Sequence, residues 1–174
     1  MTTLEQLFGG RTAVVVPEVV GPALAARTRE RFERAGYTRY ALLDRGSYDV
    51  LPDPEEPELF GPLIEIAART TSRSLVLAEV RALRLQPGDY LLAHHDRIHD
   101  GHPVELVLDL SPASVPGAEV HYRRRGQVYF RAPGAPGSLA IVERGPTVSC
   151  NHTYVTRRHA AASIVRLVML LRDG

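Results

Sequence analysis

The sequence predicts a mainly β fold in which two N-terminal helices pack on a double-sheet jelly roll or a related barrel. From about residue 75 the chain alternates apolar and polar residues, which is the period-2 pattern of half-buried strands. Pro and Gly interrupt this pattern at short intervals. Because nothing helical separates the later strands, a parallel βαβ arrangement is disfavoured.

Local signals define the elements of the first 75 residues. Pro17 ends a β-branched run, TAVVVPEVV. Pro22 near the start and Gly36 after the end of the next segment are typical boundaries of a helix. The elements expected here are a strand within 12–20, a helix at 21–36, a strand that becomes a Pro- and acid-rich loop at 39–61, and a helix at 62–75.

The second part of the chain predicts seven or eight strands at short spacing. Turn signals at PG, GHP, SPASVPG, APGAPG and RGP separate them. The segments expected to form strands are 76–96, 105–114, 118–133, 137–145 and 163–173.

Length and composition predict one domain, 1–174, with a support region at 1–75 and a jelly-roll core with a metal site at 76–174. The net charge of +1 gives no reason to expect nucleic acid or a membrane surface as a partner. The lone Cys150 cannot form an internal disulfide, and the N-terminus shows no signal peptide, so we expect a cytoplasmic protein. All 21 basic residues are Arg, so lysine chemistry is excluded.

Residues 88–102, GDYLLAHHDRIHDGH, contain four of the seven histidines and three aspartates. His94 and Asp96 are two residues apart at the end of a predicted strand, so they point to the same side, and His95 to the other. Such an H-x-D pair can occupy two neighbouring positions on a metal ion. A further histidine would complete a two-His, one-carboxylate triad, which is typical of non-haem Fe(II) oxygenases. A solvated polar loop is the alternative.

The third ligand should lie downstream, on a strand that approaches the first. His121, His152 and His159 are the candidates. Arg166 also stands out, because it interrupts the apolar strand SIVRLVMLL and a buried charge needs a partner. That partner is either a bound dicarboxylate or an internal carboxylate such as Asp109 or Glu119.

These motifs resemble the Fe(II)- and 2-oxoglutarate-dependent dioxygenases, particularly the prolyl-4-hydroxylase-like branch. The resemblance covers about residues 80–172. It rests on Gly88 six residues before His94, on PGAEVHY (116–122), on APGSLAIV (135–142), and on a distal histidine ten residues after Val142. The sequence departs from the family pattern at Leu85, where the family has Tyr, and at Ala118 within the usual GGE.

The resemblance implies a double-stranded β-helix (jelly-roll) core and an oxygenase that uses Fe(II), 2-oxoglutarate and O₂. It implies that His94, Asp96 and His152 bind the metal, while His95, His99 and His102 do not. Ala161 and Ala162 occupy the usual place of the basic cosubstrate anchor. Arg166, fourteen residues after His152, is therefore the first choice, with Arg157 and Arg158 as fallbacks. Tyr90 is a further candidate contact of the cosubstrate.

The resemblance says less about the substrate. Because the carboxylate Asp96 is present, hydroxylation of an unactivated C–H bond is expected and halogenation is not. An amino acid or an aminoacyl or peptidyl unit in bacterial biosynthetic tailoring is the expected substrate. Tyr122, Arg123 and Arg125 are candidate substrate contacts, with a core residue and a solvated hairpin tip as the alternatives. The acidic segment 49–61 is a candidate lid or a plain surface loop.

Two other functions remain open at this stage. The chain could be a cupin-like metal-binding module without oxidative chemistry, in which Arg166 is paired internally. It could also hydroxylate a side chain of a protein partner, which predicts an open groove instead of a closed pocket.

Overall fold

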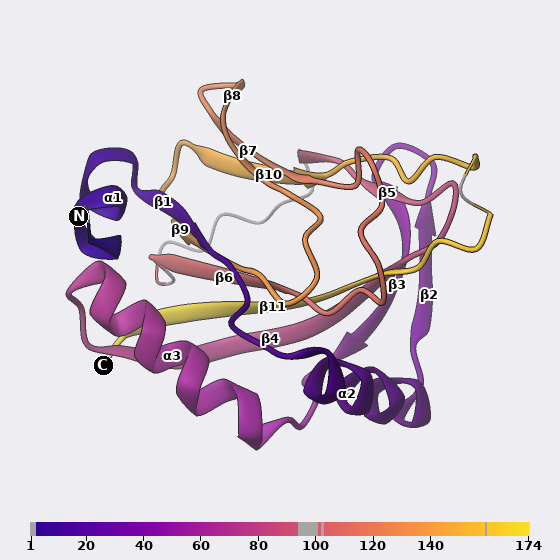
Figure 1. Cartoon of the computed structure of the whole chain (residues 1–174). Coiled ribbons are helices and arrows are strands. Elements are labelled where there is room, and N and C mark those ends of the chain that lie inside the picture. The colour runs from indigo at the N-terminus through magenta and orange to yellow at the C-terminus, as the bar shows by residue number, and fades with distance from the viewer. Residues whose placement is uncertain (1–2, 94–100, 102, 159) are drawn as a thin grey trace.

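The structure, a computed structural model, describes residues 3–93, 101, 103–158 and 160–174. Two layers of antiparallel strands face each other, and helices cover the outer side of one layer (Figure 1). The predicted mainly β fold with N-terminal helices and a double-stranded β-helix core is confirmed. No helix within these residues is long and apolar enough to cross a membrane.

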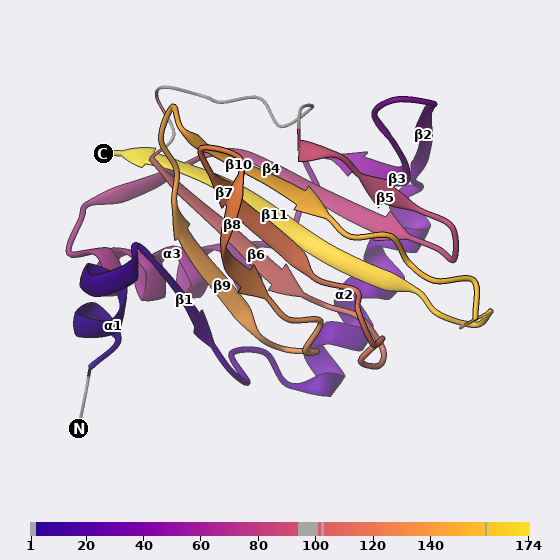
Figure 2. The same ribbon diagram turned by 90° about the horizontal axis from the view of Figure 1, so that it is seen from above.

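The larger layer, called the major sheet, contains β1 (Ala13–Val16), β9 (Leu139–Glu143), β6 (Val104–Asp109), β11 (Ile164–Asp173), β4 (Leu75–Leu85) and β3 (Gly46–Pro52), in that spatial order. β2 (Thr38–Leu42) pairs with β3. The long strands β4 and β11 run side by side through its middle (Figure 2). N-terminal strands therefore join the same sheet as the C-terminal ones.

The smaller layer, called the minor sheet, contains β5 (Tyr90–Leu91), β10 (Val148–His152), β7 (Val120–Arg124) and β8 (Gln127–Ala132). β3 connects the two layers, because its Gly46 end pairs with β5 and its Pro52 end pairs with β4. The strand order therefore continues from one layer into the other, and β1 and β8 lie at its two ends.

Strand alternation divides the apolar residues between two cores. On β11, Val165, Leu167 and Met169 face the helices. Ile164 and Val168 face the minor sheet instead. Because successive side chains of a strand point to opposite faces, the same strand fills both cores.

Three helices, one more than expected, cover the major sheet: α1 (Leu4–Arg11), α2 (Pro22–Ala35) and α3 (Pro57–Thr71). The predicted helix at 21–36 is α2. Helix α3 begins five residues before the expected start, because Pro57 and not Pro62 lies in its first turn, and it buries Leu59, Leu63 and Ala67. The acidic segment 49–61 is therefore the end of β3 and the start of α3, not one loop.

The unpredicted helix α1 begins with a capping box. The Thr3 side chain accepts a hydrogen bond from the Gln6 backbone N–H, and the Gln6 side chain accepts one from the Thr3 backbone N–H. The pattern T-x-x-Q was visible in the sequence. Its apolar residues are not gathered on one face, so the segment lacks the periodicity on which a helix prediction relies.

We expect Gly46→Ala to destabilise the protein at the connection between the layers. A Cβ at residue 46 would lie 2.7 Å from the carbonyl oxygen of Tyr90, so β3 and β5 would have to move apart. Such overpacking costs about 1–3 kcal/mol in the free energy of unfolding, measurable by urea denaturation. Gly9→Ala in α1 is the control, since a Cβ there meets no atom within 4 Å. Equal stability of Gly46→Ala and wild type would contradict this account.

Candidate active site

His152 is the last residue of β10 and points into the space between the two layers. The buried residues of β10 alternate as Val148, Cys150 and His152, which places all three on the inner face. Burial first, and then the charges of Arg166 and Arg81, lower the pKa of His152 well below its usual value. The imidazole is therefore neutral, which is the form that binds a metal ion.

Arg166 reaches His152 from the opposite layer. It lies on the inner face of β11 between Ile164 and Val168, and it is 2% exposed. Its Nη1 lies 2.9 Å from Nδ1 of His152, and its Nη2 donates a hydrogen bond to the carbonyl oxygen of Ala118 at 2.8 Å. Burial lowers the pKa of Arg166, but a guanidinium stays protonated at any working pH. A buried positive charge therefore sits beside the neutral imidazole.

Neither of the two carboxylates considered as internal partners forms a hydrogen bond or an ion pair with Arg166. Asp109 lies opposite Arg166 in the sheet register and attracts it; its Oδ1 accepts a hydrogen bond from the backbone N–H of Ser111, and its Oδ2 is buried without a hydrogen-bond partner in the described part of the chain. Glu119 lies 2.7 Å from Nε2 of His121. In the described part of the chain Arg166 forms no ion pair within 4.0 Å. A buried cation without such a partner is costly, so the site is suited to an anionic ligand.

The hydrogen bond between Arg166 and His152 is incompatible with a metal ion on the same imidazole. Arg166 can only donate, so Nδ1 accepts and the ring proton is on Nε2. A metal at Nδ1 would take the same lone pair. A metal at Nε2 would move the proton to Nδ1, which could then no longer accept. Metal binding at His152 in either mode releases the Arg166 guanidinium for another partner.

The predicted ligands His94 and Asp96 lie outside the described residues. Leu91, the last residue of β5, pairs directly with His152. Within the described residues no three His, Cys, Asp or Glu side chains converge. The following histidines also lie outside the described residues: His95, His99, His102 and His159.

The other three candidate cosubstrate contacts do not meet His152 and Arg166. Arg158 is exposed, as its neighbour Arg157 is. Tyr90 precedes the inward-facing Leu91, and its hydroxyl donates to the carbonyl oxygen of Leu43. Arg157 is exposed in the turn after β10. Its guanidinium lies against Gly88, 3.1 Å from where a Cβ would be.

The three candidate substrate contacts lie in different parts of the minor sheet and do not meet at one place. Tyr122 is fully buried between the sheets, and its hydroxyl donates to Oε1 of Glu105 at 2.7 Å. Arg123 points to the outer face of the minor sheet and donates to Oδ1 of Asn151. Arg125 is exposed in the turn after β7, at the opposite end of that strand from Val120, which pairs with His152.

Sequence reasoning missed Arg81, which lies on the inner face of β4. It pairs with Val168 of β11, and Leu83 and Leu85 follow on the same face. Its positive charge is one of the causes that lower the pKa of His152, after burial and the charge of Arg166. The period-2 pattern of β4 could have identified Arg81 as an inward-facing residue, because it places residues 81, 83 and 85 on one side of the strand.

A buried carboxylate holds the turn that leads into β5. Both carboxylate oxygens of Asp89 accept hydrogen bonds from Arg39, at 2.6 and 2.8 Å. Further hydrogen bonds come from the Ser47 hydroxyl and the Gln86 backbone N–H. Burial opposes ionisation of Asp89, but these bonds outweigh it and lower its pKa. The network fixes the end of β3 and the start of β5 next to Leu91.

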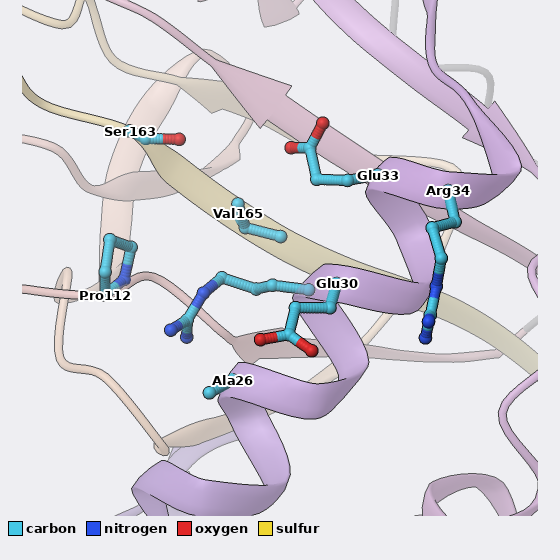
Figure 3. Close-up of a pocket in the computed structure, with 8 residues that line it drawn as sticks. Ala26, Glu30, Glu33, Arg34, Pro112, Ser163 and Val165 are labelled. Carbon is cyan, nitrogen blue, oxygen red and sulfur yellow. The ribbon is translucent and has the colours of Figure 1, made fainter.

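A cavity of about 550 Å³ lies between α2 and the helix side of the major sheet. Figure 3 shows Glu30, Glu33 and Arg34 of α2 around it, together with Pro112 and Val165. Val165 faces the helices, whereas its neighbour Arg166 faces the minor sheet. The cavity is therefore separated by the major sheet from His152.

Comparisons with known proteins identify the fold. The sequence matches no protein-family model and no curated protein. The structure matches an oxidoreductase of the 2OG-Fe(II) oxygenase family from Burkholderia pseudomallei with a TM-score of 0.78 and 11% identity, over 98% of this chain and 91% of that one. A Pseudomonas putida prolyl-4-hydroxylase matches with a TM-score of 0.72 and 15% identity, over 98% and 97% of the two chains.

A third matching solved structure is of an enzyme named for a different reaction. The non-heme alpha-ketoglutarate-dependent carbocyclase SnoK from nogalamycin biosynthesis matches with a TM-score of 0.72 and 14% identity, over 98% of this chain and 83% of that one. At these identities the matches establish the fold. The chain has the fold of the 2-oxoglutarate- and Fe(II)-dependent oxygenases, as its sequence motifs predict.

We expect Asp89→Asn to lower the free energy of unfolding by about 1–3 kcal/mol at pH 7, because hydrogen bonds to a charged carboxylate are lost. The pKa of Asp89 is lower in the folded state than in the unfolded chain. Its contribution is therefore complete above the unfolded value, about 3.9, and is lost as the pH falls through the folded value. Urea denaturation at pH 7, 5 and 3 should show the difference between variant and wild type shrinking at low pH.

Glu65→Gln, which changes an exposed carboxylate of α3, is the control for this series. A difference between Asp89→Asn and wild type that stays constant down to pH 3 would show that the charge of Asp89 is not what holds the turn.

Proposed function

We propose that the protein is an Fe(II)- and 2-oxoglutarate-dependent oxygenase. The observation that carries the proposal is the pair of Arg166 and His152, a buried guanidinium without a carboxylate partner among the described residues beside a buried neutral imidazole. The pair sits in the fold of the 2-oxoglutarate- and Fe(II)-dependent oxygenases. A dicarboxylate cosubstrate and a metal ion together satisfy both groups.

His94, Asp96 and His152 would hold Fe(II), and Arg166 would bind the far carboxylate of 2-oxoglutarate. The bound metal and cosubstrate supply, with O₂, the oxidising power to attack an unactivated C–H bond. The apolar residues around Arg166, such as Leu83 and Val168, exclude water from the site.

We propose hydroxylation of an amino acid, or of an aminoacyl or peptidyl unit, as the reaction, in a bacterial biosynthetic pathway. The matched structures include a prolyl-4-hydroxylase and a carbocyclase, so the fold serves more than one oxidative outcome. Within the described residues Arg166 forms no ion pair, which disfavours a metal-binding module without oxidative chemistry, in which this residue would be paired internally with a carboxylate. We further propose that residues 1–174 act as one cytoplasmic domain.

We expect His152→Ala to abolish retention of Fe(II) while the fold stays intact, because the site loses its buried imidazole ligand. Iron content after anaerobic loading and desalting, with circular dichroism as the check on folding, measures this. His121→Ala is the matched control, since His121 precedes the inward-facing Tyr122 and pairs with Glu119. Unchanged iron content in His152→Ala would remove it from the ligand set.

We expect Arg166→Ala to raise the 2-oxoglutarate concentration required for half-maximal turnover by roughly 30-fold or more, since losing one partner of a buried charge pair costs about 2–5 kcal/mol. Iron content should change little. Arg166→Gln gives a second variant that leaves a smaller cavity in the core. Arg157→Ala is the control, and a larger effect there would identify Arg157 as the anchor.

A further inference from the structure

A second cavity, of about 290 Å³, opens on the inner side of the major sheet. β3, β4 and β11 supply its walls. Arg81 of β4 projects from the same face as Val168, with which it pairs, and Pro52 of β3 pairs with Arg81 from the other side. The lining residues are Val50, Pro52, Asp53, Glu79, Val80, Arg81, Val168 and Leu170.

The cavity lies beside the candidate active site. Arg166 pairs with Leu83, and Arg81 is two residues away from Leu83 on the same face, so the two arginines are diagonal neighbours about 7–8 Å apart. A molecule in this cavity would therefore lie against the His152 centre.

Arg81 is the cationic side chain among the residues that line the cavity. In the described part of the chain it makes no hydrogen bond or ion pair, whereas its neighbour Arg84 binds both Asp49 and Glu33. Arg81 is half-buried and faces the cavity. A guanidinium in that position is a ready site for a carboxylate.

The rest of the lining narrows the ligand class. Val50, Val168 and Leu170 offer an apolar wall. Asp53 and Glu79 add two carboxylates, which disfavour a polyanion such as a phosphate ester, and the carboxylate of Asp53 suits an ammonium group. The volume is at the lower limit for ligand pockets, so a small molecule fits better than a peptide segment.

We propose that this cavity binds the substrate as a free, small apolar amino acid, with its carboxylate on Arg81. The assignment rests on the proposed oxygenase function, because it gives the oxidised molecule a place beside the metal. Arg166 is almost fully buried and suits the enclosed cosubstrate. The half-buried Arg81 suits a ligand that must exchange with solvent in every cycle.

Ligand-observed NMR tests the proposal without relying on activity. The probes are L-valine, L-leucine and L-proline, each beside its primary amide, titrated into protein loaded with diamagnetic Zn(II) and 2-oxoglutarate. We expect at least one acid to bind wild type tenfold or more tightly than its amide. Arg81→Gln should remove this preference, Arg81→Lys should retain part of it, and Arg27→Gln on the exposed side of α2 should retain it fully.

Three results would overturn the proposal: no acid preferred over its amide by wild type, a preference that survives Arg81→Gln, or a weaker affinity for 2-oxoglutarate in Arg81→Gln than in wild type. Titration of 2-oxoglutarate without amino acid separates this inference from the proposed function. If wild type takes up neither metal nor 2-oxoglutarate, the oxygenase proposal fails. If uptake is normal and only the preference for the acid is missing, the Arg81 site alone is wrong.

Discussion

The contact between Arg166 and His152 joins the two sheets. A guanidinium from β11 and an imidazole from β10 meet at 2.9 Å, and each residue is 2% exposed. Burying a charge without a bound carboxylate costs free energy, which the surrounding apolar core must supply. The contact also cannot survive metal binding at the same imidazole. Arg166 thus lies close to the place where an anionic cosubstrate would bind, and a metal ion bound at His152 would release its guanidinium.

The architecture that holds this pair depends on the strands that connect the layers. β3 pairs with β4 at one end and with β5 at the other, and β5 places Leu91 directly opposite His152. The close approach at Gly46 and the hydrogen bonds to Asp89 fix this connection. Residues far from His152 in sequence therefore determine where the chain enters the H-x-D motif.

Much of the fold could be predicted, because the later strands have a regular period-2 pattern and clear turn residues. Arg166 was identifiable since a lone charge in an apolar strand requires a partner. The start of α3 was misplaced because two prolines, Pro57 and Pro62, each suit a first turn. Helix α1 was missed because its stability depends on capping and contacts, which apolar periodicity does not show.

The site could be predicted only in part. The order and spacing of the motifs identify His152. The sequence alone does not show which face of a sheet a polar side chain occupies, because that depends on the strand register. Arg123 and Arg125 were chosen for their charge, and the structure puts them away from His152. Arg81 was passed over, although the alternation of β4 puts it on the inner face. Strand register, a tertiary property, decides between these arginines.

Anaerobic titration of the Fe(II)-loaded protein with 2-oxoglutarate is the most direct test of the central claim. The account predicts a weak visible charge-transfer band in wild type, because the cosubstrate chelates a metal ion held at His152. The same titration of His152→Ala should give no band. The absence of a band in wild-type protein shown to be folded and loaded with iron would contradict the account, and would leave the histidine-rich motif as a metal-binding segment without oxygenase chemistry.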